Sequence, residues 1–235
     1  MKIRLARLVQ HHHFYQRSAT LTVLCAAILF TAPCSGQSAG HWSYTVGNTF
    51  ITPKVSSGDM SGPGPAGIKI DVGHAYAPTL SASTMLNDHL ATEFRFDLPT
   101  RYDISGKGTY DNVGKIASIR QTLASLFLQY RFQNATAAFR PYIGVGPAYA
   151  HFPDVTSTTT LDALLGPTTI KADDHFGGAA QIGAIYRLTD RWFVEASVTK
   201  TFLKTKLTLT SGCIVRTIDA RLDPVSVNVS VGYQF

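Results

Sequence analysis

The stretch that decides the fold is Val225-Ser226-Val227-Asn228-Val229-Ser230-Val231-Gly232-Tyr233-Gln234-Phe235. Valine and aromatic residues alternate in it with small or polar residues. Because successive side chains of a β-strand point to opposite faces, this segment has one apolar face and one polar face. A strand of a soluble β-sandwich can look similar, but an unbroken series of small and polar residues on the second face favours a strand between lipid and a wet interior. The pattern therefore predicts a membrane-spanning β-strand.

Seven earlier segments alternate in the same way: residues 42–53, 79–86, 90–98, 119–132, 139–152, 176–188 and 191–209. Most approach the ~9–11 residues that a tilted strand needs to cross a bilayer. A sheet exposed to lipid must close on itself, because unpaired backbone amides in hydrocarbon cost several kcal/mol each. The sequence therefore predicts an all-β fold, an eight-stranded antiparallel transmembrane β-barrel.

The connections between these segments alternate between short and long. Residues 87–88, 133–138 and 189–190 are short, whereas residues 55–77, 100–118, 153–175 and 210–222 are long. Bacterial outer-membrane barrels have short periplasmic turns and longer extracellular loops. We therefore expect four longer extracellular loops, the first of them flexible because it is rich in glycine and proline over residues 58–67.

The N-terminal residues 1–39 have the layout of a secretory signal peptide, with four basic residues before an apolar stretch at 21–32. We expect cleavage near Ala39, with Gly36 as the alternative, and a mature barrel domain spanning residues 40–235. The leader holds four of the 21 basic residues and none of the 15 acidic ones, so the mature net charge falls from +6 to +2. That charge gives no footprint for nucleic-acid binding. Cys213 is the one cysteine expected in the mature chain, so no intrachain disulfide is predicted.

Two segments resemble the OmpW family of small outer-membrane β-barrel proteins. They are FRPYIGVG at residues 139–146, followed by Tyr149 and Phe152, and YRLTDRWFV at residues 186–194. The ending GYQF at 232–235 is similar to the last strand of that family. The resemblance implies an eight-stranded barrel in the outer membrane of a Gram-negative cell and passage of small hydrophobic molecules. Some members are receptors for phage or bacteriocins, and one branch imports alkanes. In barrels of this kind, Tyr233 and Phe235 would form the signal for the outer-membrane assembly machinery.

Polar and charged side chains on the inner faces are predicted to line the lumen: Glu93, Arg95, Asp97, Gln129, Arg131, Arg140, Tyr142, Gln181, Arg187 and Glu195. An eight-stranded barrel is barely wide enough inside for side chains, and buried charges must be paired. We therefore expect the charges to pair across the lumen, either as a plug that stiffens the barrel or as a selectivity element in a narrow path. An upper hydrophobic pocket is predicted from Phe152, Phe176, Leu203 and Leu207, from which a solute would leave sideways into the membrane.

Three lysines, Lys200, Lys204 and Lys206, are predicted to face outward, where they either contact lipopolysaccharide phosphates or form a solvated rim. The adjacent Asp173, Asp174 and His175 could suggest a protease, but successive strand residues face opposite ways and do not converge. No serine–histidine motif and no metal-ligand spacing is present. We therefore expect no enzyme activity, no cofactor and no metal. The predicted function is passive uptake of small, mostly hydrophobic molecules; the alternative is a non-conducting surface barrel whose extracellular loops act as a receptor or adhesion site.

Overall fold

A computed structural model describes residues 40–58, 60–62, 68–109, 111 and 113–235. The predicted signal peptide and its cleavage site lie outside the described residues, as does most of the glycine- and proline-rich segment expected to be flexible. Across the described ranges, no helix is long and apolar enough to cross a membrane.

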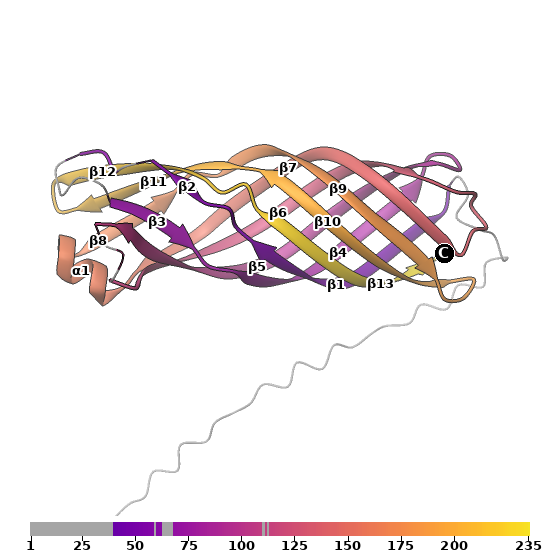
Figure 1. The fold of residues 1–235 in the computed structure, drawn as a ribbon, viewed down its shortest axis with the longest axis horizontal. Coiled ribbons are helices and arrows are strands. Elements are labelled where there is room, and N and C mark those ends of the chain that lie inside the picture. The colour runs from indigo at the N-terminus through magenta and orange to yellow at the C-terminus, as the bar shows by residue number, and fades with distance from the viewer. Residues whose placement is uncertain (1–39, 59, 63–67, 110, 112) are drawn as a thin grey trace, which may run out of the picture. The chain divides into compact units, whose positions relative to one another are not determined.

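Eight long strands form a closed antiparallel barrel (Figure 1). They are β1 (Trp42–Thr52), β4 (Ala75–Met85), β5 (Leu90–Gly108), β6 (Lys115–Arg131), β7 (Phe139–Ser157), β9 (His175–Arg187), β10 (Trp192–Phe202) and β13 (Val225–Gln234). Their order around the ring is β5-β4-β1-β13-β10-β9-β7-β6, and pairing of β6 with β5 closes it. The predicted eight-stranded barrel is confirmed.

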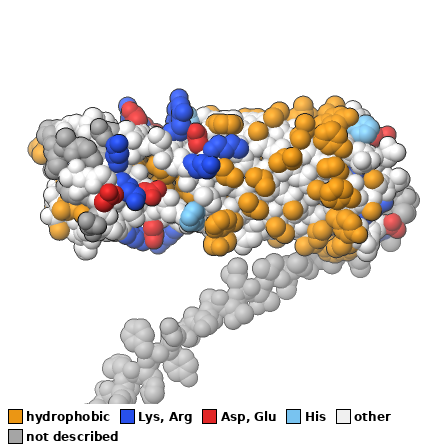
Figure 2. All heavy atoms as spheres, viewed as in Figure 1, with side chains coloured by type: hydrophobic (Ala, Val, Ile, Leu, Met, Phe, Trp, Pro, Cys, Tyr) orange, Lys and Arg blue, Asp and Glu red, His pale blue; other side chains and the backbone are white. Residues whose placement is uncertain are grey.

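The alternation in the sequence becomes the two faces of the barrel wall. In β13, Val227, Val229 and Val231 are exposed on the outer face, whereas Asn228 and Ser230 are buried inside. The outer face carries a broad apolar band, which Figure 2 shows covering the half of the barrel nearer the short turns. Aromatic side chains gather on this face at the short-turn end: Trp42, Tyr44, Tyr130, Phe132, Tyr186, Trp192, Tyr233 and Phe235.

The short turns are stabilised by the side chains that begin them. The Asn87 Oδ1 accepts hydrogen bonds from the main-chain nitrogens of His89 and Leu90, at 2.9 and 2.7 Å. The Thr189 hydroxyl accepts from the main-chain nitrogen of Trp192 at 3.0 Å. Asparagine and threonine favour such turns because their oxygen atoms reach the backbone two or three residues ahead.

Three of the four connections at the opposite end are longer than the short turns, as predicted, but much of their length is regular structure; the fourth, between β5 and β6, is shorter than expected. Strands β5 and β6 continue well past the expected bounds, so their connection shrinks to residues 109–114. The other connections add β2 (Ser56–Ser57), β3 (Ile68–Val72), α1 (Thr159–Leu165), β8 (Thr168–Ala172), β11 (Lys204–Ser211) and β12 (Ile214–Arg221). Strand β3 pairs with β5, and β2, β12, β11 and β8 form a separate four-stranded sheet. We call these six added elements, β2, β3, α1, β8, β11 and β12, the extension.

A bulge in β5 changes which side chains face inward. Glu93, Arg95 and Asp97 are buried inside the barrel, but the next buried positions are Tyr102 and Ile104. The register between β5 and β6 shifts between Asp97 and Thr100. Such an extra residue re-aims the strand that follows it. The inner surface is therefore charged on the short-turn side of the bulge and largely apolar on the side of the extension.

Candidate functional site

A cluster of charged and amide side chains fills the interior of the barrel on the short-turn side of the bulge. At its centre, Glu93 uses both carboxylate oxygens. Its Oε1 accepts hydrogen bonds from Nε and Nη2 of Arg95, at 3.2 and 3.0 Å. Its Oε2 accepts from the side-chain amides of Gln129 and Gln181, at 2.6 and 3.0 Å. Four donors therefore hold this buried carboxylate, which is what an interior charge requires.

Arg95 links Glu93 to a second buried acid. Its Nη2 lies 3.6 Å from Oε1 of Glu195, and the hydroxyl of Tyr142 donates to the same oxygen. On another side the guanidinium carbon lies 5.7 Å from the ring centre of Phe127, within the range of a cation–π contact. The two acids and Arg95 thus form one ionic group that spans strands β5 and β10.

The cluster extends to both sides through neutral partners. Arg131 donates to Oε1 of Gln129 at 3.0 Å and to the hydroxyl of Ser83 at 3.2 Å. Asp97 accepts from the hydroxyl of Thr79 at 2.8 Å. All of these side chains are buried. We call the cluster the polar plug: Ser83, Glu93, Arg95, Asp97, Gln129, Arg131, Tyr142, Gln181 and Glu195.

Two arginines that were expected to pair across the lumen donate hydrogen bonds to the short turns. Arg140 is buried, but its Nη2 donates to main-chain oxygens, at 2.5 Å to Asp88 and 3.4 Å to Gln133. Arg187 is only partly buried, and its Nη2 donates to the carbonyl oxygen of Thr136. Both residues lie at the end of the barrel, where carbonyl oxygens of the short turns are within reach of their guanidinium groups.

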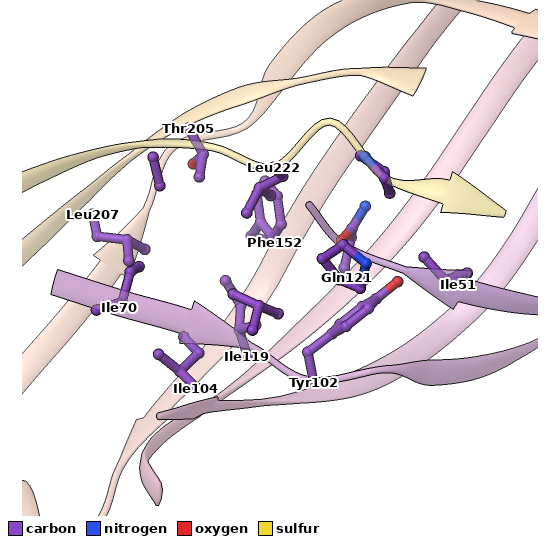
Figure 3. Close-up of a pocket in the computed structure, with 14 residues that line it drawn as sticks. Ile51, Ile70, Tyr102, Ile104, Ile119, Gln121, Phe152, Thr205, Leu207 and Leu222 are labelled. Carbon is purple, nitrogen blue, oxygen red and sulfur yellow. The ribbon is translucent and has the colours of Figure 1, made fainter. Parts of the chain in front are cut away.

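On the other side of the bulge, the interior is apolar and nearly filled. A cavity of about 20 Å³ lies between β1, β3, β5, β6, β7, β11 and β12 (Figure 3). Its lining includes Ile51, Tyr102, Ile119, Phe152 and Leu207. A second apolar cavity, also about 20 Å³, shares Leu207 with the first and reaches Leu161 of α1. We call the two cavities together the apolar chamber; each has room for about one water molecule.

Three of the four predicted pocket residues lie at the chamber or close to it, and the fourth does not. Phe152 and Leu207 line the chamber, and Leu203 is buried in the same apolar core. Phe176, however, is 73% exposed, and its ring packs on that of Tyr149 on the outer face, with centroids 4.5 Å apart. The assignment of Phe176 to the pocket was wrong, because β9 alternates without a break and Phe176 shares the outward face of Ile182.

The sequence missed most residues of the chamber. Tyr102, Ile104 and Ile119 line it, but they fall in or beside the segment expected to be a loop. The available signal was that Tyr102 and Ile104 are apolar residues two positions apart, as on one face of a strand. The inward positions change from odd to even numbers between Asp97 and Tyr102, so the segment did not continue the pattern of the strand before it.

Asp174 lies outside the membrane-spanning segments and is held by three donors. Its carboxylate accepts from the main-chain nitrogen of Phe152 at 2.9 Å, from Nδ1 of His151 at 2.7 Å and from the hydroxyl of Tyr149 at 2.8 Å. The bond from Phe152, with that from His151, holds the pKa of Asp174 below its ordinary value. Asp174 thus contacts His151 rather than the adjacent His175. In the described part of the chain, no three His, Cys, Asp or Glu side chains are grouped to bind a metal.

Comparisons with known proteins agree with this architecture. The model of the OmpW family matches residues 38–235. Outer membrane protein W of Vibrio cholerae is 28% identical over 216 residues, which is 92% of this chain and 97% of that protein. Outer membrane protein AlkL of Ectopseudomonas oleovorans is 23% identical over 88% of this chain and 87% of its own length.

Among solved structures, the outer membrane protein OprG of Pseudomonas aeruginosa superposes with a TM-score of 0.79 at 27% identity, covering 85% of this chain and 98% of OprG. The short turns are therefore periplasmic, and the extension is extracellular. The family match covers all of the described residues, and Outer membrane protein W of Vibrio cholerae aligns over nearly its whole length. The chain is thus an outer-membrane β-barrel protein and belongs to the OmpW family.

Proposed function

We propose that this protein is a passive outer-membrane uptake channel for small, mostly hydrophobic molecules. The observation that carries the proposal is the arrangement of the interior, an enclosed apolar chamber in the extracellular half above a polar plug in the periplasmic half. Transport by such a channel is facilitated diffusion down a gradient and requires no cofactor.

The polar plug serves as the barrier in this proposal. An apolar solute that entered it would have to break hydrogen bonds around buried charges such as Glu93 and Arg95, and each unsatisfied group costs about 1–3 kcal/mol or more. The plug lines the lumen, but it does not offer an apolar molecule a path to the periplasm. The same interactions stiffen the barrel, so the structural role and the barrier role coexist.

The apolar chamber serves as the entry compartment. Moving apolar surface out of water is favourable by roughly 25 cal/mol per Å², so a hydrocarbon-like solute gains by entering a space walled by Ile119, Phe152 and Leu207. Because the cavities measure only about 20 Å³ each, a solute must displace side chains or the covering segments to enter. Helix α1 is one such covering segment, because its Leu161 lines the second of the two cavities.

An interruption of strand pairing in the barrel wall, which we call the seam, offers a lateral exit at the end of the apolar chamber nearest the polar plug. The ladder between β4 and β5 stops at the pair Thr79–Asp97, and pairing of β5 resumes with β3 at Ile104. Pro99 lies in this interval and has no N–H to donate. A bond from the Thr100 hydroxyl to the Tyr76 carbonyl, 2.5 Å long, bridges the seam in place of a ladder. Tyr76 is exposed on the outer face there, and the proposal requires lipid to reach the seam at this residue.

The experiment that tests the function is uptake by cells that lack this gene and carry it, or a variant, on a plasmid. We expect faster uptake of a labelled alkane or alkyl aromatic with the wild-type protein, and no change for a sugar of similar mass. Leu207→Asp places a charge in the chamber wall and should abolish the gain, whereas Val215→Asp, at an exposed position of β12, should not. Equal uptake with and without the protein contradicts the proposal.

A second candidate is a surface receptor or adhesion site. The observation that favours it is the ordered β11–β12 hairpin, which presents Ile214 and Val215 at its exposed tip. Replacing both residues with serine would abolish binding of a host, phage or bacteriocin ligand while leaving solute uptake intact, which separates the two functions.

A further inference from the structure

We propose that the outer wall of the extension binds a phosphate group of lipopolysaccharide between Lys204 and Arg221. The phosphate-bearing lipid of the outer leaflet is the ligand, and the site holds the barrel at a fixed depth in that leaflet. The proposal does not depend on transport, since the residues involved lie on the outside of the wall.

The site is an open groove on the outer face of the β2-β12-β11-β8 sheet, with a volume of about 430 Å³. Buried Thr205 and Ala220 lie at its floor and longer polar side chains at its walls. The full lining is Ser56, Asp173, His175, Lys204, Thr205, Lys206, Asp219, Ala220 and Arg221. The groove is therefore polar, open to the outside and wide enough for a phosphate with its attached sugar.

Two like charges face each other across the groove. In the β11–β12 ladder, Lys204 lies directly opposite Arg221, and the next pair on the same face is Lys206 opposite Asp219. Like charges in directly opposed positions destabilise a sheet, whereas opposite charges stabilise it. Lys206 has an acid within reach, 4.0 Å from Asp219 Oδ1, and Arg221 has a long contact of 3.9 Å to Asp223. An anion bound between Lys204 and Arg221 would remove the repulsion at the first pair.

The structure also separates Lys200 from this site, although the sequence grouped it with the other two lysines. The Nζ of Lys200 donates to the carbonyl oxygen of Asp223 and lies 6.0 Å from the ring centre of Phe202. Lys200 is therefore engaged within the wall, while Arg221, which the sequence placed in a loop, supplies the second charge of the groove.

The groove follows the last exposed aromatic residues of the barrel wall, and the proposal places the lipid phosphates at this level. Phe202 ends β10 and Phe176 is the second residue of β9, so both exposed rings lie at the ends of these strands nearest the extension. Lys204 follows Phe202 by two residues, so it stands roughly 7 Å further along the wall at about 3.4 Å per strand residue. In Figure 2, basic side chains gather directly beside the apolar band. Guanidinium and ammonium groups at this level suit a phosphate dianion through charge-assisted hydrogen bonds.

The test measures binding and heat stability of the intact purified protein in detergent. The probes are diphosphoryl lipid A, the same lipid with both phosphates removed, and inorganic phosphate alone. The test variant is Lys204→Gln/Arg221→Gln. The control is Lys171→Gln, an exposed lysine of β8 that lies opposite Thr208 in the same sheet and outside the groove lining.

We expect the wild-type protein and the control to bind diphosphoryl lipid A about tenfold more tightly than the double variant, since two charge-assisted contacts are lost. Without lipid, the double variant should melt at the same temperature as the wild type or higher, because the repulsion is gone. Addition of lipid A should then raise the melting temperature of the wild type more than that of the variant. Equal lipid A affinity in the double variant and the wild type overturns the proposal. So does equal binding of the dephosphorylated lipid, or a full effect from inorganic phosphate alone.

Discussion

Arg95 and Glu93 form a buried ion pair on the inner face of β5, with Nη2 and Oε1 3.0 Å apart. They are two residues apart on one strand, so they project side by side into the lumen. Arg95 also approaches Glu195 at 3.6 Å. One guanidinium therefore compensates two buried carboxylates, which makes it the side chain on which the plug depends most.

Replacing Arg95 by methionine should lower the free energy of unfolding by about 3–5 kcal/mol, because it removes the cation that approaches both buried acids, Glu93 and Glu195. Heat-induced loss of β-structure in detergent, followed by circular dichroism, measures the change. The triple variant Arg95→Met/Glu93→Gln/Glu195→Gln should recover most of the loss. The exposed Arg101→Met serves as the control and should change stability little. An Arg95→Met barrel as stable as the wild type would contradict the account of the plug.

Gly146 allows β7 to approach β6 closely. A Cβ atom there would lie 1.8 Å from the carbonyl oxygen of Leu126, so backbone must move to admit it. Gly146→Ala should destabilise the barrel by about 1–3 kcal/mol or prevent its assembly. At Gly178 a Cβ would meet nothing within 4 Å, so Gly178→Ala should be neutral or slightly stabilising. The fraction of heat-resistant folded protein on a gel measures both, and equal behaviour of the two variants would refute the close approach.

The stability that the hydrogen bonds to the Asp174 carboxylate contribute should depend on pH. This carboxylate is held by Phe152, His151 and Tyr149, and its pKa lies below the ordinary value. A lowered folded-state pKa contributes stability above the unfolded pKa, and that contribution is lost as the pH falls through the folded pKa. The melting temperature of the wild type should therefore exceed that of Asp174→Asn at neutral pH and converge with it in acid. A difference that grows on acidification would be the contrary result. Asp190→Asn, at an exposed position in the turn before β10, is the control.

The seam at Pro99 predicts a transport defect when it is closed. Pro99→Ala adds an N–H to the interval where the β4–β5 ladder has stopped and the β3–β5 ladder has not begun, and it should slow uptake of apolar solutes by cells. Pro147→Ala is the matched control, since Pro147 also lies in a wall strand but within a continuous ladder opposite Gly178. Both variants should fold. If Pro99→Ala transports as fast as the wild type, solute does not leave through this seam.

The apolar chamber predicts that extra room favours binding. Leu207 lines both cavities, so Leu207→Ala joins and enlarges them at a stability cost of about 2–5 kcal/mol. The variant should bind a small aromatic such as a halobenzene more tightly than the wild type, as measured by the rise in melting temperature on adding it. Ile185→Ala is the control, because Ile185 is buried with Tyr142 and Phe193 and lines neither cavity. If the aromatic stabilises neither variant, the chamber does not hold apolar solutes.

The sequence predicted the membrane-spanning part of the barrel because lipid imposes a strict alternation there. Val227, Val229 and Val231 face outward as expected, and Glu93 and Arg95 face inward. The extension was harder to predict, because its strands are not bathed in lipid and their outer faces carry charges such as Lys204.

The prediction of site residues failed where the alternation of inward and outward side chains was interrupted, in β5, or was not followed to its end, in β9. The bulge after Asp97 moved the inward positions to Tyr102 and Ile104, which a strict period of two cannot follow. Phe176 was the opposite error, since an unbroken alternation along β9 already placed it outward. The turn-binding roles of Arg140 and Arg187 depend on carbonyl positions that no side-chain pattern encodes.

The most direct test of the uptake route is photo-crosslinking in intact cells with an alkyl probe that carries a diazirine, followed by mass spectrometry of the purified protein. The account predicts crosslinks on chamber residues such as Phe152 and Leu207 and their loss in Leu207→Asp. Crosslinks confined to the lipid-facing band, at residues such as Leu80 and Val229, would contradict it.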